Sequence, residues 1–197
     1  MATYVDAIHK SSDQINPDQM YVKKKSEYNV KIKSDVSQTC YISGICILPS
    51  GETIVADYTN KRVKMLDKHY NVYGDLKVDG NPQDICQILP EQVAITFENR
   101  VQFINVIKKG RLPYAIHGIS VYETRELPHA TLGITYHQGD LYITSGTALY
   151  HYDLSGTDLT HKKSLYEDTG SGITGKMCCK YINCIFNIVN TVLTVET

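Results

Sequence analysis

Histidines are the side chains of this 197-residue chain whose grouping comes nearest to a metal or catalytic site. Seven are present, and four of them fall in one region, at His117, His129, His137 and His151. None forms an HxH, HExxH or HxxxH pattern with a carboxylate nearby, so the spacing predicts no metal site. The chain also has no GxSxG nucleophile motif and no P-loop. These patterns favour a non-catalytic protein that uses no cofactor.

Six cysteines, at positions 40, 46, 86, 178, 179 and 184, form no CxxC pair and no paired zinc-binding spacing. Cys40, Cys46 and Cys86 lie within apolar runs, where a free cysteine behaves as a small buried hydrophobic residue. The first fourteen residues lack a basic region followed by an apolar stretch, so they do not form a secretory signal. We therefore expect free thiols, a reducing compartment and a cytoplasmic location.

Charge is balanced, with 20 basic and 21 acidic residues and a formal net charge of -1. A neutral chain creates no general field that would draw it to nucleic acid or to a membrane surface. RNA binding would need local charge beside stacking rings, and the basic stretches at 23–25, 31–33 and 108–111 are scattered. The longest apolar stretch, about 181–195, is shorter than the roughly 20 residues of a membrane span. We expect no membrane partner.

Short β-rich runs divided by turn residues begin at about residue 21 and are typical of an all-β protein. The apolar run 45–48 ends at a Pro-Ser-Gly turn, and apolar residues resume at 53–56. Further runs follow at 63–66 and 72–78. Four short strands within about 40 residues are predicted, which is the size of one blade of a propeller.

This unit recurs along the chain. The sequence SGICILP at 43–49 matches QDICQILP at 83–90, and NKRVK at 60–64 falls opposite ENRVQ at 98–102. A third, degenerate unit extends from Leu132 to Tyr152. Because Ile134 lies about 49 positions after Ile85, instead of the repeat of about 40, we expect an enlarged loop at 108–113 or 124–128.

The first unit resembles an NHL repeat. In the string ISGIC–LPSG–IVADYTNKRV, Asp57, Asn60 and Arg62 stand where that repeat places its Asp, Asn and Arg-Val. The segments 137–150 and 165–168 are similar to propellers of tripartite-motif-like proteins that are expanded in molluscs. The resemblance covers about residues 21–176. It implies a propeller that binds protein or RNA, attached in the family to RING, B-box and coiled-coil segments that transfer ubiquitin.

The predicted fold is therefore an incomplete NHL-type β-propeller of about three to four blades, each with four antiparallel strands. It spans 21–176, between a polar leader at 1–20 and a divergent apolar tail at 177–197. Family propellers have about six blades, so open sheet edges that pair with other copies are expected. No cysteine–histidine cluster has RING or B-box spacing, so we do not expect ligase activity of this chain.

Loops after second strands and loops between blades lie on one face of a propeller, where exposed side chains on a rigid frame often bind partners. The candidate partner-binding rim comprises Tyr58, Asn60, Lys61, Asn81, Glu98 and His129. We predict structural roles for Asp57, Arg62 and Arg100, because a guanidinium fork suits a carboxylate or the backbone carbonyls of a turn.

The sequence thus predicts a non-catalytic module that binds a protein partner, as the substrate-recognition part of a relative of the tripartite-motif ubiquitin ligases. Three alternatives stay open. They are an RNA-binding propeller, a propeller enzyme of the lactonase or lyase type with a metal on the central axis, and a truncated fragment without independent function.

Overall fold

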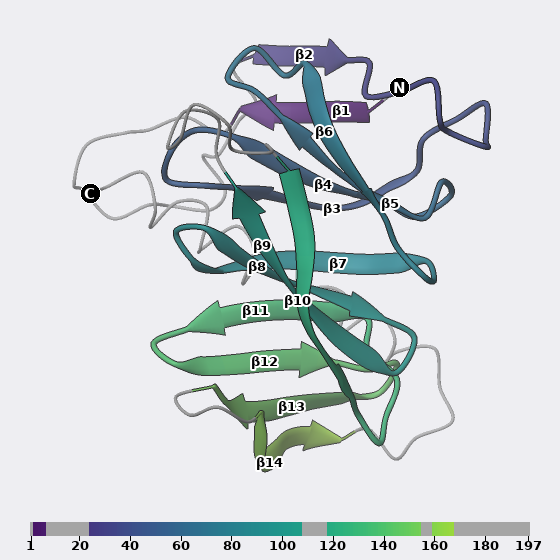
Figure 1. The fold of residues 1–197 in the computed structure, drawn as a ribbon. Helices are drawn as coiled ribbons and strands as arrows, with labels where there is room; N and C mark the ends of the chain where they lie inside the picture. The colour runs from purple at the N-terminus through teal and green to yellow at the C-terminus, as the bar shows by residue number, and fades with distance from the viewer. Residues whose placement is uncertain (1, 7–23, 108–117, 155–158, 168–197) are drawn as a thin grey trace.

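The structure, a computed structural model, describes residues 2–6, 24–107, 118–154 and 159–167 (Figure 1). Fourteen β-strands and no helix occur in these ranges. Among the described residues there is accordingly no helix that is long and apolar enough to cross a membrane. The sequence-predicted tail at 177–197 lies outside the described residues.

Twelve of the strands form three antiparallel sheets of four, which we call blades 1 to 3. Blade 1 contains β3 (Ile42–Ile47), β4 (Thr53–Asp57), β5 (Arg62–Leu66) and β6 (Val72–Lys77). Blade 2 contains β7 (Pro82–Leu89), β8 (Gln92–Phe97), β9 (Arg100–Ile107) and β10 (Gly118–Glu126). Blade 3 contains β11 (Gly133–His137), β12 (Asp140–Thr144), β13 (Ala148–Asp153) and β14 (Thr160–Glu167).

The three sheets are arranged as consecutive blades of an incomplete β-propeller. Within each sheet the strands neighbour one another in chain order, and the first strands β3, β7 and β11 lie side by side (Figure 1). Each blade therefore begins at the same inner edge and ends at an outer strand. The predicted all-β, incomplete propeller is confirmed.

Hydrophobic layers between the blades form most of the core. Ile54, Val63 and Met65 of blade 1 pack with Ile95 and Ile104 of blade 2. A second layer joins blade 2 to blade 3 and contains Cys86, Val101, Phe103, Ile134, Leu141 and Ile143. The core is thus divided into successive interfaces, so each blade depends on its neighbour for burial.

Tight turns connect the strands where the sequence predicts them. Between β11 and β12 only Gln138 and Gly139 intervene, and both have positive φ, 48° and 93°. Two such residues make the type I′ turn that matches the twist of a two-residue hairpin. Of the two stretches proposed for an enlarged loop, 108–113 lies outside the described residues, and 124–126 of the other belong to β10.

A segment before blade 1 covers the face of that blade that points away from blade 2. Residues 29–41, which we call the strap, place Val30 against Val55 and Leu66. Because the strap covers one face and blade 2 the other, all five residues of β4 are buried. This explains why β4 is an unbroken apolar run that ends in one aspartate, rather than an alternation of polar and apolar residues.

Two further strands pair outside the blades. β1 (Ala2–Asp6) and β2 (Lys24–Tyr28) form an antiparallel ladder in which Ala2 lies opposite Tyr28. The stretch 1–20 was expected to be a leader without a sustained strand pattern, yet it contributes β1. Its partner lies about twenty positions away, so local periodicity gives no signal for the pairing.

Candidate functional site

A fully buried lysine connects the strap to blade 1. The ammonium of Lys64 on β5 donates to carboxylate oxygens of Asp35 and Asp57, each at 2.7 Å, and to the carbonyl of Val30 at 3.0 Å. Asp35 and Val30 belong to the strap, whereas Asp57 ends β4. A buried charge is tolerated only when it is paired and hydrogen-bonded, and Lys64 meets both conditions.

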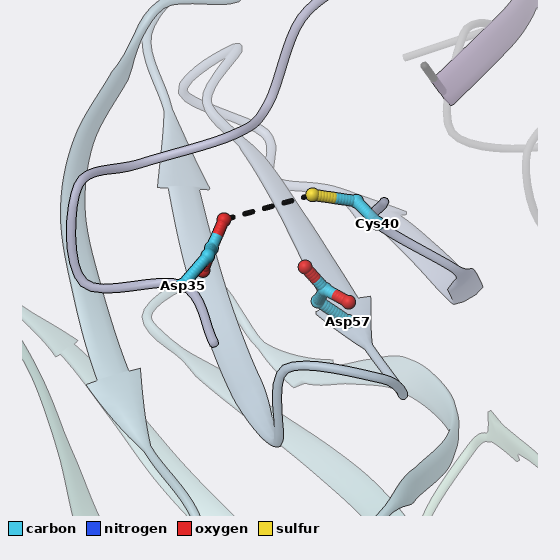
Figure 2. Close-up of side chains that lie close together, drawn as sticks. All are labelled: Asp35, Cys40 and Asp57. Carbon is cyan, nitrogen blue, oxygen red and sulfur yellow. Dashed lines mark hydrogen bonds between the residues drawn. The ribbon is translucent and has the colours of Figure 1, made fainter. Parts of the chain in front are cut away.

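Asp35, Cys40 and Asp57 lie close enough together to be considered as metal ligands (Figure 2). The Nζ atom of Lys64, however, lies 2.7 Å from both carboxylates and 3.5 Å from the sulfur of Cys40. The ammonium therefore occupies the place that a cation would take. Arg62 also lies beside Asp35, with its Nε 3.7 Å from a carboxylate oxygen, so a second cation adjoins the cluster.

The pKa values of the cluster fit a structural role. Burial by itself would raise the pKa of Asp57, but hydrogen bonds from Lys64 and Asn60 outweigh it and hold the pKa below its usual value. Burial would likewise lower the pKa of Lys64, but its bonds to Asp35 and Asp57 raise it above the usual value. Burial raises the pKa of Cys40 to about 11, so its thiol is a poor nucleophile at neutral pH.

The predicted structural residues Asp57 and Arg62 contact different partners. Asp57 accepts hydrogen bonds from Asn60 and Lys64. Arg62 donates to the carbonyl of Ser34 at 3.0 Å and pairs with Asp75 on β6. The two motif residues thus hold the β4–β5 turn and the strap.

Arg100, the equivalent of Arg62 in blade 2, has different surroundings. Its guanidinium carbon lies 5.3 Å from the centre of the Phe97 ring. A Cβ placed on Gly80 would lie 3.1 Å from its terminal nitrogen, so Arg100 contacts the connection between blades 1 and 2. Its Nε has no hydrogen-bond partner among the residues that the structure describes. The geometry is that of a cation resting against an aromatic ring.

Turns and blade connections are joined by hydrogen bonds at one end of the blades. Asn81, in the β6–β7 connection, donates from its side-chain amide to the carbonyl of Tyr58 at 3.0 Å. In the next blade, the amide of Thr131 donates to the carbonyl of Glu98. We call residues 58–61, 79–81, 98–99 and 127–132 the rim face. The structure therefore brings the predicted rim residues to one end of the molecule.

The predicted rim residues differ in exposure. Lys61 and Glu98 are exposed, and Tyr58, Asn81 and His129 are half-buried. Tyr58 packs edge to face against Tyr41 of the strap, whose side chain is 60% exposed. Asn60 departs from the prediction, because it is buried and its side chain bonds to Asp57 and to the amide of Ser37. It fixes the turn to the strap and presents no side chain to a partner.

A pocket of about 380 Å³ lies beside the rim face, between the β10–β11 connection and the outer strands of blade 3. Its more buried lining residues are Leu127, Tyr150 and Tyr152, together with the half-buried His129. Glu126, Pro128 and His161 are exposed and mark its opening, and Leu159 completes the lining. Most of the lining is apolar or aromatic, as in ligand-binding pockets.

His129 is held rigidly in this pocket. Its ring stacks on Tyr150 at 3.6 Å between centroids, its Nδ1 lies 2.8 Å from the carbonyl of Ala130, and its Nε2 lies 2.7 Å from the hydroxyl of Tyr152. A carbonyl only accepts, so we assign the proton to Nδ1 and let Nε2 accept from Tyr152. Burial lowers the pKa of His129, which favours this neutral form.

Sequence reasoning missed Lys64, Asp35 and most of the pocket. One signal for Lys64 was present, since this lysine stands between apolar residues, Val63 and Met65, in the strand RVKML. The pocket gave no such signal, because His129 and Tyr152 are 23 positions apart and meet only through the fold. Of the pocket residues, His129 alone belonged to the predicted rim.

Comparisons with known proteins show the fold. No protein-family model matches the sequence, and no curated protein matches it. Among solved structures, a chain of the mitotic checkpoint complex is similar with a TM-score of 0.50 and 9% identity, covering 82% of this chain and 50% of that one. Myxococcus xanthus glutaminyl cyclase gives a TM-score of 0.49 and 13% identity, covering 67% and 53%. This chain thus spans about half the length of these structures.

Proposed function

We propose that this chain is a non-catalytic protein-interaction module that binds its partner on the rim face. The observation that carries the proposal is the bonding of the rim turns to the blade connections, from Asn81 to Tyr58 and from Thr131 to Glu98. These bonds give the exposed side chains of the rim face a fixed frame. A fixed frame favours binding because less conformational entropy is lost on association.

The exposed side chains of the rim face are of the types found in protein–protein interfaces. Tyr41 of the strap extends the face with an exposed ring, and Lys61 and Glu98 add opposite charges. Aromatic rings surrounded by polar groups are the usual composition of protein interfaces. The shared propeller fold is compatible with such a role, as a chain of that fold occurs in the mitotic checkpoint complex.

Finer aspects of the proposal rest on the sequence. The resemblance to NHL repeats supports a substrate-recognition role in a relative of the tripartite-motif ubiquitin ligases. Free cysteines at positions 40, 46 and 86 support a reducing, cytoplasmic setting. The chemistry of ubiquitin transfer would then belong to another polypeptide or segment.

The test is quantitative capture of partners from a cytoplasmic extract by the purified chain. The rim variant carries Tyr41→Ala and Lys61→Glu, both at exposed positions. The matched control is Lys68→Glu, an exposed lysine in the β5–β6 turn at the opposite end of blade 1. We expect the rim variant to lose at least 90% of specifically captured protein and Lys68→Glu to retain it.

Other outcomes would overturn the proposal. Capture that disappears after ribonuclease treatment, with RNA bound through the same rim, would assign the module to RNA. Stoichiometric metal in the purified chain would favour the propeller-enzyme alternative. Equal loss in the Lys68→Glu control would place binding away from the rim face. Light scattering on the same sample tests the expected self-association through sheet edges.

A further inference from the structure

We propose that the pocket formed by the β10–β11 connection, β13 and β14 receives the guanidinium group of an arginine side chain from the protein partner. This inference deepens the proposed function and rests on it, since the pocket adjoins the rim face through His129. It specifies that the partner residue bound in this pocket is an arginine.

The walls offer fixed aromatic surfaces. Tyr150 is stacked against His129, and Tyr152 is held by its hydroxyl contact with the same imidazole. His161 of β14 lies edge to face with Tyr152 at 5.1 Å between centroids. A planar guanidinium stacks on such rings and is attracted by the negative charge of their faces. Because the rings are already held in place, little ordering is needed when the cation enters.

The charge of the pocket selects a cation. Among the lining residues that the structure describes, Glu126 is the only carboxylate, and none is a lysine or arginine. Within the described part of the chain Glu126 has no ion-pair partner, whereas the neighbouring Glu123 pairs with Arg125. Burial lowers the pKa of His129, which favours the neutral imidazole that does not offset the carboxylate. A guanidinium at the opening would meet both the carboxylate and the aromatic walls.

The dimensions fit a side chain rather than a large ligand. A volume of about 380 Å³ is at the low end of the range of pockets that bind small molecules. The opening, marked by the exposed residues Glu126, Pro128 and His161, allows an extended peptide to pass outside while one side chain enters. Arginine is also among the residues that contribute most to binding at protein interfaces.

The experiment measures binding of two short peptides to the full chain by ligand-observed NMR. One is acetyl-Gly-Arg-Gly-amide, and the other carries citrulline, which has the same shape without the charge. We expect the arginine peptide to bind at least tenfold more tightly than the citrulline peptide. Glu126→Gln should weaken the arginine peptide about fivefold, and Tyr150→Leu should weaken it at least as much.

Control variants keep the test decisive. Glu167→Gln removes an exposed carboxylate elsewhere on β14 and should leave binding unchanged. Glu126 is exposed, so its substitution tests the pocket even if Tyr150→Leu unfolds the chain. Equal binding of the two peptides, or arginine binding that survives Glu126→Gln, would overturn the inference.

Failure here can be distinguished from failure of the proposed function. If the rim variant loses its partners but the peptides are not discriminated, the interaction module stands and the arginine pocket is wrong. If the peptides are discriminated but the rim variant retains every partner, the pocket stands and the rim face is wrong.

Discussion

At the scale of single residues, Lys64 shows how much a single buried charge can hold together. Its ammonium is bonded to two carboxylates and one carbonyl, from both the strap and blade 1. Replacing such a group by an apolar one leaves two carboxylates without their cation in a place that water does not reach. Removing one partner of a buried ion pair costs more stability than the intact pair contributes, because the remaining charge stays buried and unpaired.

We therefore predict that Lys64→Met lowers the free energy of unfolding by about 3–5 kcal/mol, as measured by urea denaturation. Lys77→Met, which removes an exposed lysine of β6, should change it by less than about 0.5 kcal/mol. A Lys64→Met variant as stable as the wild type would show that the cluster contributes no net stability.

His129 predicts a pH dependence whose sign follows from burial. Its folded pKa lies below the ordinary value, which is about 6.5 in the unfolded chain. Between those two values the unfolded state binds more protons, so stability falls as pH drops below about 6.5. His129→Gln should therefore lose less stability than the wild type between pH 7.5 and 5.5, as measured by thermal unfolding. Parallel curves for the two proteins would contradict this assignment.

Single residues were predicted from the sequence where a local motif defines them. Asp57, Asn60 and Arg62 stand in a fixed turn pattern, which located the turn but not its contacts with the strap. Asp35 is a polar residue in a polar segment, so its sequence context does not predict a role. It meets Lys64 only because the strap folds over blade 1. Exposure of Asn60 was mispredicted because turn residues are usually solvated.

At the scale of elements, the close approach of the inner strands β3 and β7 explains why position 44 is a glycine. A Cβ on Gly44 of β3 would lie 2.9 Å from the carboxylate of Asp84 and 2.9 Å from the backbone nitrogen of Ile85 on β7. The partner atoms include backbone, which cannot move aside cheaply. The neighbouring Ser43 also bonds across the same interface, donating to the carbonyl of Pro82 at 2.7 Å.

Gly44→Ala should consequently destabilise the chain by about 1–3 kcal/mol through overpacking between blades 1 and 2. The matched control is Gly118→Ala on β10, where a Cβ meets no atom of the described residues within 4 Å. That control should shift the unfolding free energy by less than about 1 kcal/mol. Equal effects of the two substitutions would show that the inner strands separate readily.

Strands were the elements that the sequence predicted best. Runs such as 53–56 are apolar and bounded by turn residues, so their position follows from composition and from the repeat. The pairing of β1 with β2 was not predictable, because it joins segments that do not border one another in sequence.

At the scale of the whole molecule, one carboxylate of blade 2 connects neighbouring blades. Asp84 accepts a hydrogen bond from the amide of Ile134 in blade 3 at 3.0 Å, and it lies against Gly44 of blade 1. Asp84 is buried, so an amide left without this acceptor would find no water in its place. The carboxylate thus couples the inner edges of three blades.

Asp84→Ala should accelerate amide hydrogen exchange at Ile134 about tenfold and lower stability by about 1–3 kcal/mol. Asp79→Ala, at an exposed aspartate of the β6–β7 connection, serves as the control. Unchanged exchange at Ile134 would show that blade 3 is held to blade 2 by its hydrophobic layer alone.

The arrangement of blades followed from the repeat, since each unit contributes one four-stranded sheet. The pocket did not follow, because a recess between blades depends on how two sheets pack rather than on either sequence. The strap was not predicted either, because its residues carry no repeat pattern.

The strap also has a consequence for the order of synthesis. Its contacts with blade 1 reach no farther along the chain than Leu66, which packs against Val30, and every strap partner named above precedes residue 80. The strap therefore leaves the ribosome before the strands it covers, and the ion cluster can close before blade 3 has been translated. One face of the nascent sheet is then shielded from neighbouring chains, while the other is left for blade 2, the next segment to emerge.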